Sequence, residues 1–79
     1  MDDLRRVLAE NISELRKSNN LTQAEFAERL NYSDKAVSKW ERGMAYPSMN
    51  TVIKMAELFQ VSMDVVLGLA PIPSSGESA

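Results

Sequence analysis

The segment SDKAVSKWERG, residues 33–43, spaces its polar side chains regularly. At about 100° per residue in an α-helix, these side chains fall on one face. They are Asp34, Lys35, Ser38, Lys39 and Arg42. In a DNA major groove, lysine donates to guanine O6 and N7, aspartate accepts from cytosine N4, and serine does either. The same charges also suit a face that meets only solvent, so the spacing alone leaves both explanations open.

The opposite face of the same segment is apolar and carries Ala36, Val37 and Trp40. An aromatic side chain in register with aliphatic ones is typical of a helix that packs on a core. We therefore predict a helix over 33–42 that ends at Gly43 and buries Trp40, in preference to a tryptophan that stacks on bases. Glu41 lies at the edge of this apolar face, where a carboxylate needs a partner.

Composition argues against an enzyme. The 79 residues include no His and no Cys, which removes the commonest general base, the commonest metal ligands and disulfides. The Ser and Asp residues fall at expected helix starts, without a partner to activate them. We predict no catalysis, no cofactor and no metal. The absence of a long apolar run or a signal-peptide pattern favours a cytoplasmic protein with no membrane partner.

Charge is distributed unevenly along the chain, although the net charge is only −2. Residues 16–54 contain seven Lys and Arg against four Asp and Glu, whereas both flanking segments are negative. A local positive field matters more for nucleic-acid binding than the total charge. The distribution leaves DNA binding open, and the acidic balance keeps a protein partner as the alternative.

Apolar periodicity and cap signals predict five short helices and no strand, an all-α fold. The expected ranges are 3–18, 22–30, 33–42, 48–59 and 62–68. The segment 70–79, APIPSSGESA, has two Pro, one Gly and three Ser without an apolar face. We expect it to be disordered, either as a linker or as the natural end of the chain. The predicted domain therefore covers residues 1–69.

Local signals also predict how the helices begin and which sides they bury. Thr22 with Glu25 forms a capping box, and Leu21 is expected to pack against Phe26. Ser33, Ser48 and Ser62 are expected N-caps, and Asn19 or Asn20 a left-handed helix end. The expected buried positions of the second and fourth helices are Ala24, Ala27, Leu30, Val52, Ile53, Met55, Ala56 and Phe59.

About three residues join the second helix to the third, which forces the steep crossing of a helix-turn-helix. Three blocks in order, LTQAEFA, SKWERG with Pro47 soon after, and MAELFQVSMDVVL, carry a resemblance over residues 4–69. The chain resembles the DNA-binding domain of the phage-repressor and Cro (XRE-like, Cro/C1-type) family of transcriptional regulators. The resemblance implies a compact five-helix lambda-repressor-like domain with the helix-turn-helix at helices two and three.

The resemblance assigns roles to individual residues. It implies that Gln23 binds a DNA phosphate, where a helix start already favours anions, although Gln23 could be only a helix-start residue. Asp34, Lys35, Ser38 and Lys39 become the base-reading set, with Asp34 alternatively a helix-stabilising acid. The phosphate neighbours are Tyr32, Ser33, Arg42, Tyr46, Ser48 and Asn50. Family members pair the residue at Glu41 with a base late in helix one, which implies an Arg16–Glu41 ion pair.

The expected function is a sequence-specific, double-stranded-DNA-binding regulator, in the first instance a repressor. Regulators of this type commonly dimerise, and the apolar C-terminal edge of Val66, Leu67 and Leu69 is the predicted interface. These residues could equally close the core of a monomer. The alternative function is a protein-interaction module, such as an antitoxin or adaptor, because one fold hosts several functions.

Overall fold

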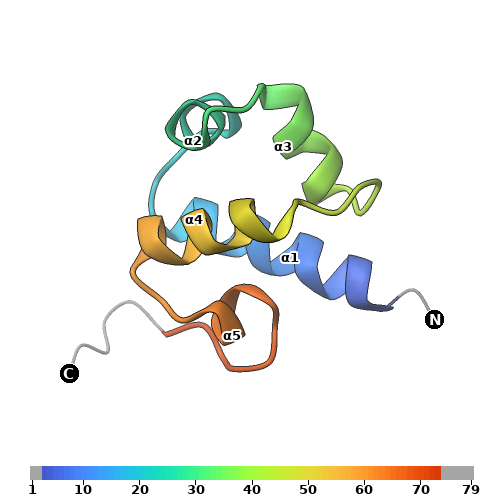
Figure 1. Cartoon of the computed structure of the whole chain (residues 1–79), viewed down its shortest axis with the longest axis vertical. Helices are drawn as coiled ribbons and strands as arrows, with labels where there is room; N and C mark the ends of the chain where they lie inside the picture. The colour runs from blue at the N-terminus through green and yellow to red at the C-terminus, as the bar shows by residue number, and fades with distance from the viewer. Residues whose placement is uncertain (1–2, 74–79) are drawn as a thin grey trace.

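The computed structural model describes residues 3–73, and these contain five helices and no strand. The helices are α1 (Asp3–Ser18), α2 (Gln23–Leu30), α3 (Asp34–Glu41), α4 (Met49–Phe59) and α5 (Met63–Val66). Figure 1 shows α2 and α3 together on one side of α1 and α4, with α5 on the opposite side. The all-α prediction is confirmed.

Side-chain caps begin the helices where the sequence places them. The hydroxyls of Thr22, Ser33, Ser48 and Ser62 each accept a hydrogen bond from a backbone N–H three residues later. Glu25 completes the capping box, because its carboxylate accepts from the Thr22 N–H at 2.9 Å. Each such cap satisfies an N–H that the helix leaves unpaired. The helix boundaries therefore follow from local chemistry.

Left-handed residues end several helices. Asn20, Asn31 and Gln60 have φ near +60°, and Gly43 follows α3 with φ +72°. Gly68 ends the segment after α5 with φ +83°, and a Cβ built there would lie 2.5 Å from Val7 Cγ1. Only glycine combines that backbone with so close an approach. Gly68 thereby lets the end of α5 contact α1.

The core lies between α1 and the other helices and includes Ile12, Phe26, Val37 and Met55, all fully buried. Trp40 is only 5% exposed, which confirms its prediction as a core residue. The rings of Phe26 and Phe59 pack with centroids 5.3 Å apart, within the range of favourable aromatic pairs. The apolar face of α3 is thus held against the domain, and its polar face is left outside.

Three positions correct the sequence-based expectations. Ala24 and Ile53 are exposed, although both were expected in the core. At 100° per residue, each lies about a third of a turn from the centre of its helix's buried arc. Val66 was expected at an exposed edge, yet it is fully buried and belongs to the core. It cannot contribute to an interface in the folded protein.

The chain continues to touch the core past the expected domain end. Ala70 and Ile72 are partly buried and pack against the core cluster. The expected disordered segment 70–79 falls partly outside the described residues, since these end at 73. The division at residue 69 therefore stays a prediction. None of the helices within residues 3–73 is long and apolar enough to cross a bilayer.

Candidate nucleic-acid interface

A tight turn joins α2 to α3 and sets their relative orientation. Asn31 adopts φ +64° at the end of α2, and the Tyr32 N–H donates to Ala27 O at 2.9 Å. Ser33 then caps α3, with its hydroxyl accepting from the Ala36 N–H at 3.2 Å. The two short helices and three linking residues form a helix-turn-helix, visible at the top of Figure 1.

The predicted base-reading set lies on the outer side of α3. Asp34, Lys35 and Lys39 are exposed, and Ser38 is half-buried. Val37 and Trp40, on the inner side, are buried. A rigid helix with a free polar face is the geometry that enters a major groove. The structure brings these four side chains onto one accessible surface.

Arg42 folds back along this surface toward the start of α3. Its Nε donates to Ser38 O at 3.3 Å and to Ser38 Oγ at 3.2 Å. The sequence-based assignment placed Ser38 among the base readers and Arg42 among the phosphate neighbours. In the structure these two side chains are hydrogen-bonded to each other, so their roles cannot be assigned separately.

Glu41 and Arg16 lie together beneath the surface, as the sequence-based pairing expected. Arg16 Nε donates to Glu41 Oε2 at 2.7 Å, and Arg16 Nη2 donates to Oε1 at 3.1 Å. The side chains are only 11% and 7% exposed. Arg16 Nη1 also donates to Leu21 O at 2.7 Å, so the guanidinium links α1, the segment before α2, and α3. A paired and hydrogen-bonded charge is tolerable at this depth, whereas a lone one is not.

Gln23 joins this ion pair, a contact that the sequence did not reveal. Its Nε2 donates to Glu41 Oε1 at 3.0 Å, so the carboxylate accepts from Arg16 and Gln23 together. Gln23 is the first residue of α2 and is half-buried. The amide nitrogen of Gln23 has two hydrogens. One is donated to Glu41, and this hydrogen bond fixes the direction in which the other hydrogen points. Residues 18 positions apart carry no local signal of such a contact.

Tyr32 connects the helix-turn-helix to the start of α4. Thr51 Oγ1 donates to the Tyr32 hydroxyl at 3.1 Å, and the Thr51 and Ser48 hydroxyls are hydrogen-bonded at 2.9 Å. Hydrogen bonds from Thr51 and then Ser48, with the charge of Lys54, lower the pKa of Tyr32 from its ordinary value. The Tyr32 ring packs on Trp40 with centroids 5.2 Å apart. This predicted phosphate neighbour therefore also joins three elements.

The remaining predicted phosphate neighbours lie near the start of α4. Ser48 and Asn50 are exposed at its first turn, and Tyr46 is exposed in the preceding loop. The Arg5 guanidinium lies over the Tyr46 ring, 5.6 Å from its centroid, close enough for a cation–π contact. Arg5 was not among the expected site residues, and its separation from Tyr46 in the chain explains why.

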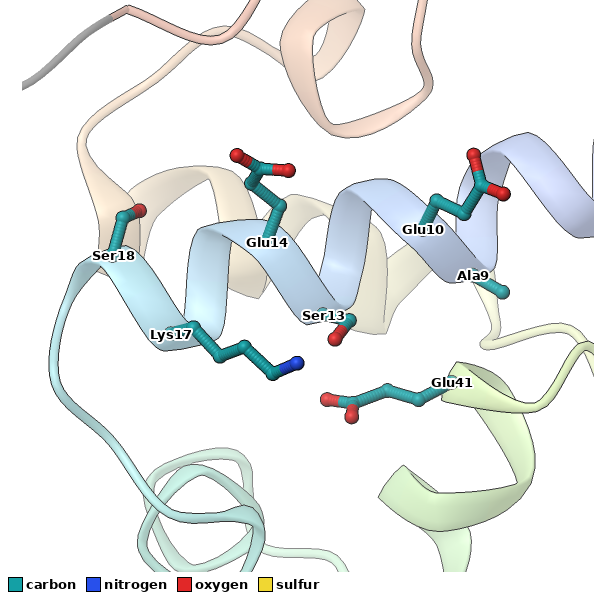
Figure 2. Close-up of a pocket in the computed structure, with 7 residues that line it drawn as sticks. All are labelled: Ala9, Glu10, Ser13, Glu14, Lys17, Ser18 and Glu41. Carbon is teal, nitrogen blue, oxygen red and sulfur yellow. The ribbon is translucent and has the colours of Figure 1, made fainter.

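A hollow between α1 and the end of α3 has a different character. Figure 2 shows Lys17 extending toward Glu41, while Glu10 and Glu14 point to the other side of α1. The lining residues include three glutamates and one lysine, and Glu41 is already paired with Arg16, so the hollow offers no concentration of positive charge to a phosphate. Among residues 3–73 no cluster of acidic side chains could hold a metal ion. The hollow is not a candidate for the DNA-facing surface.

Comparison with known proteins places this geometry in a family. A family model described as helix-turn-helix matches residues 12–66. The HTH-type transcriptional activator BcrR of Enterococcus faecalis is 41% identical over 58 residues, which are 73% of this chain and 28% of that protein. The cryptic phage CTXphi transcriptional repressor RstR of Vibrio cholerae serotype O1 is 31% identical over 61 residues, 77% of this chain and 54% of that protein. The chain thus spans about half or less of these relatives.

A solved structure agrees with the sequence relatives. The crystal structure of a hypothetical transcription factor, NHTF from Neisseria, has a TM-score of 0.75 and 28% identity. It covers 85% of this chain, and this chain covers 78% of it. The family model spans the C-terminal part of α1 and all of the later helices, including both helices of the turn motif. The chain belongs to the helix-turn-helix family of the phage-repressor and Cro type.

Proposed function

We propose that this chain is a sequence-specific, double-stranded-DNA-binding transcriptional regulator whose α3 enters the major groove. The observation that carries the proposal is the outer face of α3, where exposed Lys35 and Lys39 stand above buried Val37 and Trp40. A buried inner face fixes the helix, and a free polar face on a helix of this width matches the groove. The family membership supports the same reading.

Phosphate contacts position the protein in this mechanism. Gln23 begins α2, Ser33 caps α3, and Ser48 caps α4, so each lies at a helix start where free N–H groups favour an anion. Tyr46 and Asn50 flank the start of α4 and are exposed. Such contacts set the register of the protein on the duplex, and base contacts from α3 supply the sequence preference.

The simplest consequence of such binding is that the bound protein changes transcription from the promoter that it covers. A protein held on a promoter blocks other proteins from the same DNA, so we propose repression as the sign. One relative is named an activator and another a repressor, so both signs occur among similar proteins. A promoter–reporter fusion, with and without the protein, decides the sign. We also propose that the protein acts in the cytoplasm, where its DNA target lies, and that its function involves no catalytic step.

We propose that the protein binds DNA as a homodimer through its C-terminal edge. Leu67 and Leu69 form the interface, without the Val66 that the sequence-based prediction included. Leu69 is 74% exposed and Leu67 is half-buried, whereas Val66 is buried in the core. Val7 on α1, 39% exposed, lines the same hollow as Leu69 and adds apolar surface. Burying such surface between two copies is favourable. Such a dimer would carry two copies of α3, as the recognition of two half-sites requires.

The test of the DNA proposal is selection from a pool of random duplexes. The selected duplex is then titrated with protein between about 50 and 200 mM salt. We expect two symmetry-related half-sites, a steep salt slope, and a preference of at least about 10³-fold over random DNA. Gln23→Ala should weaken binding to all duplexes alike. No enrichment, with weak and unselective binding, would overturn the proposal and favour a protein partner for the polar face of α3.

A further inference from the structure

We propose that Arg42 reads a base edge from the middle of α3, and that Ser38 is the positioning residue that holds its guanidinium there. The proposal rests on the proposed function, since it requires α3 to enter the major groove. It replaces two sequence-based assignments, Arg42 as a phosphate neighbour and Ser38 as a direct base reader. The chemistry recognised is the O6 and N7 pair of a guanine.

The position of the guanidinium follows from its hydrogen bonds. Arg42 Nε donates to Ser38 O and Ser38 Oγ, at 3.3 and 3.2 Å. Ser38 lies four residues before Arg42, about one helical turn and 6 Å along the axis. Helical side chains point back toward the N-terminus, which is the direction that Arg42 takes. Its charged end therefore lies over the middle of α3, although its Cα lies at the C-cap.

The hydrogen bonds leave the end of the guanidinium available. Nε uses its one hydrogen on Ser38, and within residues 3–73 Nη1 and Nη2 form no hydrogen bond or ion pair. Those two nitrogens present parallel N–H groups in one plane, the arrangement that pairs with guanine O6 and N7. A side chain already held in one orientation loses less conformational entropy on binding than a free one.

Ser38 is poorly placed to reach a base by itself. It is half-buried, and its hydroxyl is attached through a single methylene, whereas neighbouring Lys35 and Lys39 are exposed and long. These lysines and Arg42 surround Ser38 and would meet the groove floor first. The Ser38 hydroxyl already accepts from Arg42. Ser38 thus acts on sequence preference through the orientation of Arg42.

The experiment compares variants on the duplex that the unmodified protein selects. Equilibrium binding is measured for that duplex, for each of its single-base-pair changes, and for random DNA at one salt concentration. The variants are Arg42→Lys, Arg42→Ala, Ser38→Ala, Ser38→Thr and the double variant Ser38→Ala with Arg42→Lys. Arg42→Lys is the matched control for charge, because it keeps the cation and loses the planar fork. Ser38→Thr keeps the hydroxyl, and thermal unfolding verifies that each variant is folded.

Arg42→Lys should lower the preference at one base pair by about tenfold, with binding to random DNA nearly unchanged. Ser38→Ala should lower the preference at that same base pair, and Ser38→Thr should retain it. The double variant should be no worse than Arg42→Lys alone, because both changes remove one interaction.

Three results would overturn the inference. If Arg42→Lys keeps every base preference and Arg42→Ala weakens all duplexes alike, Arg42 is a phosphate contact. If Ser38→Ala changes the preference at a different base pair, Ser38 reads that base directly. If the unmodified protein selects no duplex, the proposed function itself fails and the inference fails with it, which separates that case from the other two.

Discussion

Glu41 connects three helices through a single carboxylate. Its two oxygens accept from Arg16 on α1 and Gln23 on α2, and Glu41 itself ends α3. The same carboxylate therefore ties α3 to α1 and α2 and orients the side chain that we propose binds a phosphate. Lys39, by contrast, is exposed on α3 and takes part in none of these hydrogen bonds.

Replacing Glu41 by Gln should lower the free energy of unfolding by about 1–3 kcal/mol, because Arg16 keeps its buried charge without a counter-charge. Urea denaturation measures the change. The double variant Arg16→Met with Glu41→Leu is the control, since removing both charges should cost less than removing one. An unchanged midpoint for Glu41→Gln would show that the pair does not stabilise the fold.

Replacing Lys39 by Ala should cost about 1–3 kcal/mol of binding free energy on the preferred duplex and relax specificity at one base pair. Binding should weaken because Lys39 is exposed on the outer face of α3, where its ammonium group can donate to a base. The fold should be unaffected, because the exposed side chain does not belong to the core. Competition between the selected duplex and random DNA measures the effect. Equal losses on both would count against Lys39 as a base reader. The exposed Lys17, which lines the acidic hollow, provides a charge-matched control.

At the scale of the elements, the start of α4 is fixed to the helix-turn-helix by hydroxyl groups. Tyr32 from the turn, with Ser48 and Thr51 from α4, forms one hydrogen-bonded cluster. Thr51 is buried, so its hydroxyl needs these partners. The cluster sets the distance between α3 and the start of α4, the two places proposed to meet a base edge and a phosphate.

Ionisation of Tyr32 should therefore stabilise the fold at alkaline pH. The hydrogen bonds from Thr51 and Ser48 lower the pKa of Tyr32 in the folded state. Folded protein then releases its proton before unfolded protein does, so stability rises as pH increases through the folded pKa and the gain is complete above about 10, the unfolded pKa. The gain is lost again as pH falls through the folded pKa.

The measurement is the urea midpoint as a function of pH for the unmodified protein and for Tyr32→Phe. The difference between the two midpoints should grow as pH rises toward about 10. The ultraviolet absorbance of ionised tyrosine is followed over the same pH range for both proteins. The unmodified protein should show a tyrosine with a lowered pKa, and Tyr32→Phe should lack it. A difference independent of pH would contradict the lowered pKa.

At the scale of the whole molecule, the side proposed to face DNA and the apolar C-terminal edge are separated by α1 and α4 (Figure 1). Figure 1 shows α5 and the following segment on the opposite side of α1 and α4 from α2 and α3. Leu69 is the most exposed of the large apolar side chains in the described residues. A dimer formed at this edge leaves both copies of α3 free to bind.

Replacing Leu69 by Lys should shift the protein toward monomer and weaken binding to the two-half-site duplex, with little effect on a single half-site. The reason is that the charge would be buried between two copies. Sedimentation equilibrium measures the oligomeric state. Ile53→Lys is the matched control, because Ile53 is also exposed but lies on α4. A monomeric unmodified protein, or a Leu69→Lys dimer of unchanged affinity, would reject this interface.

The sequence by itself determined the helices and the turn between α2 and α3. Thr22, Ser33, Ser48 and Ser62 begin helices through hydrogen bonds that span three residues, so the signal lies within the segment it controls. The burial of Trp40 was also predictable, because apolar periodicity marks the inner face of one helix. The Arg16–Glu41 contact came from the family resemblance and not from spacing.

Only the tertiary structure decided which side chains meet across elements. The Gln23–Glu41 and Tyr32–Thr51 hydrogen bonds join residues 18 and 19 positions apart, and their geometry depends on how whole helices pack. The exposure of Ile53 and the burial of Val66 depend on the same packing, since periodicity gives the face of a helix but not the width of the surface that covers it. Local hydrogen bonds are therefore encoded in short segments, whereas the site is assembled by the core.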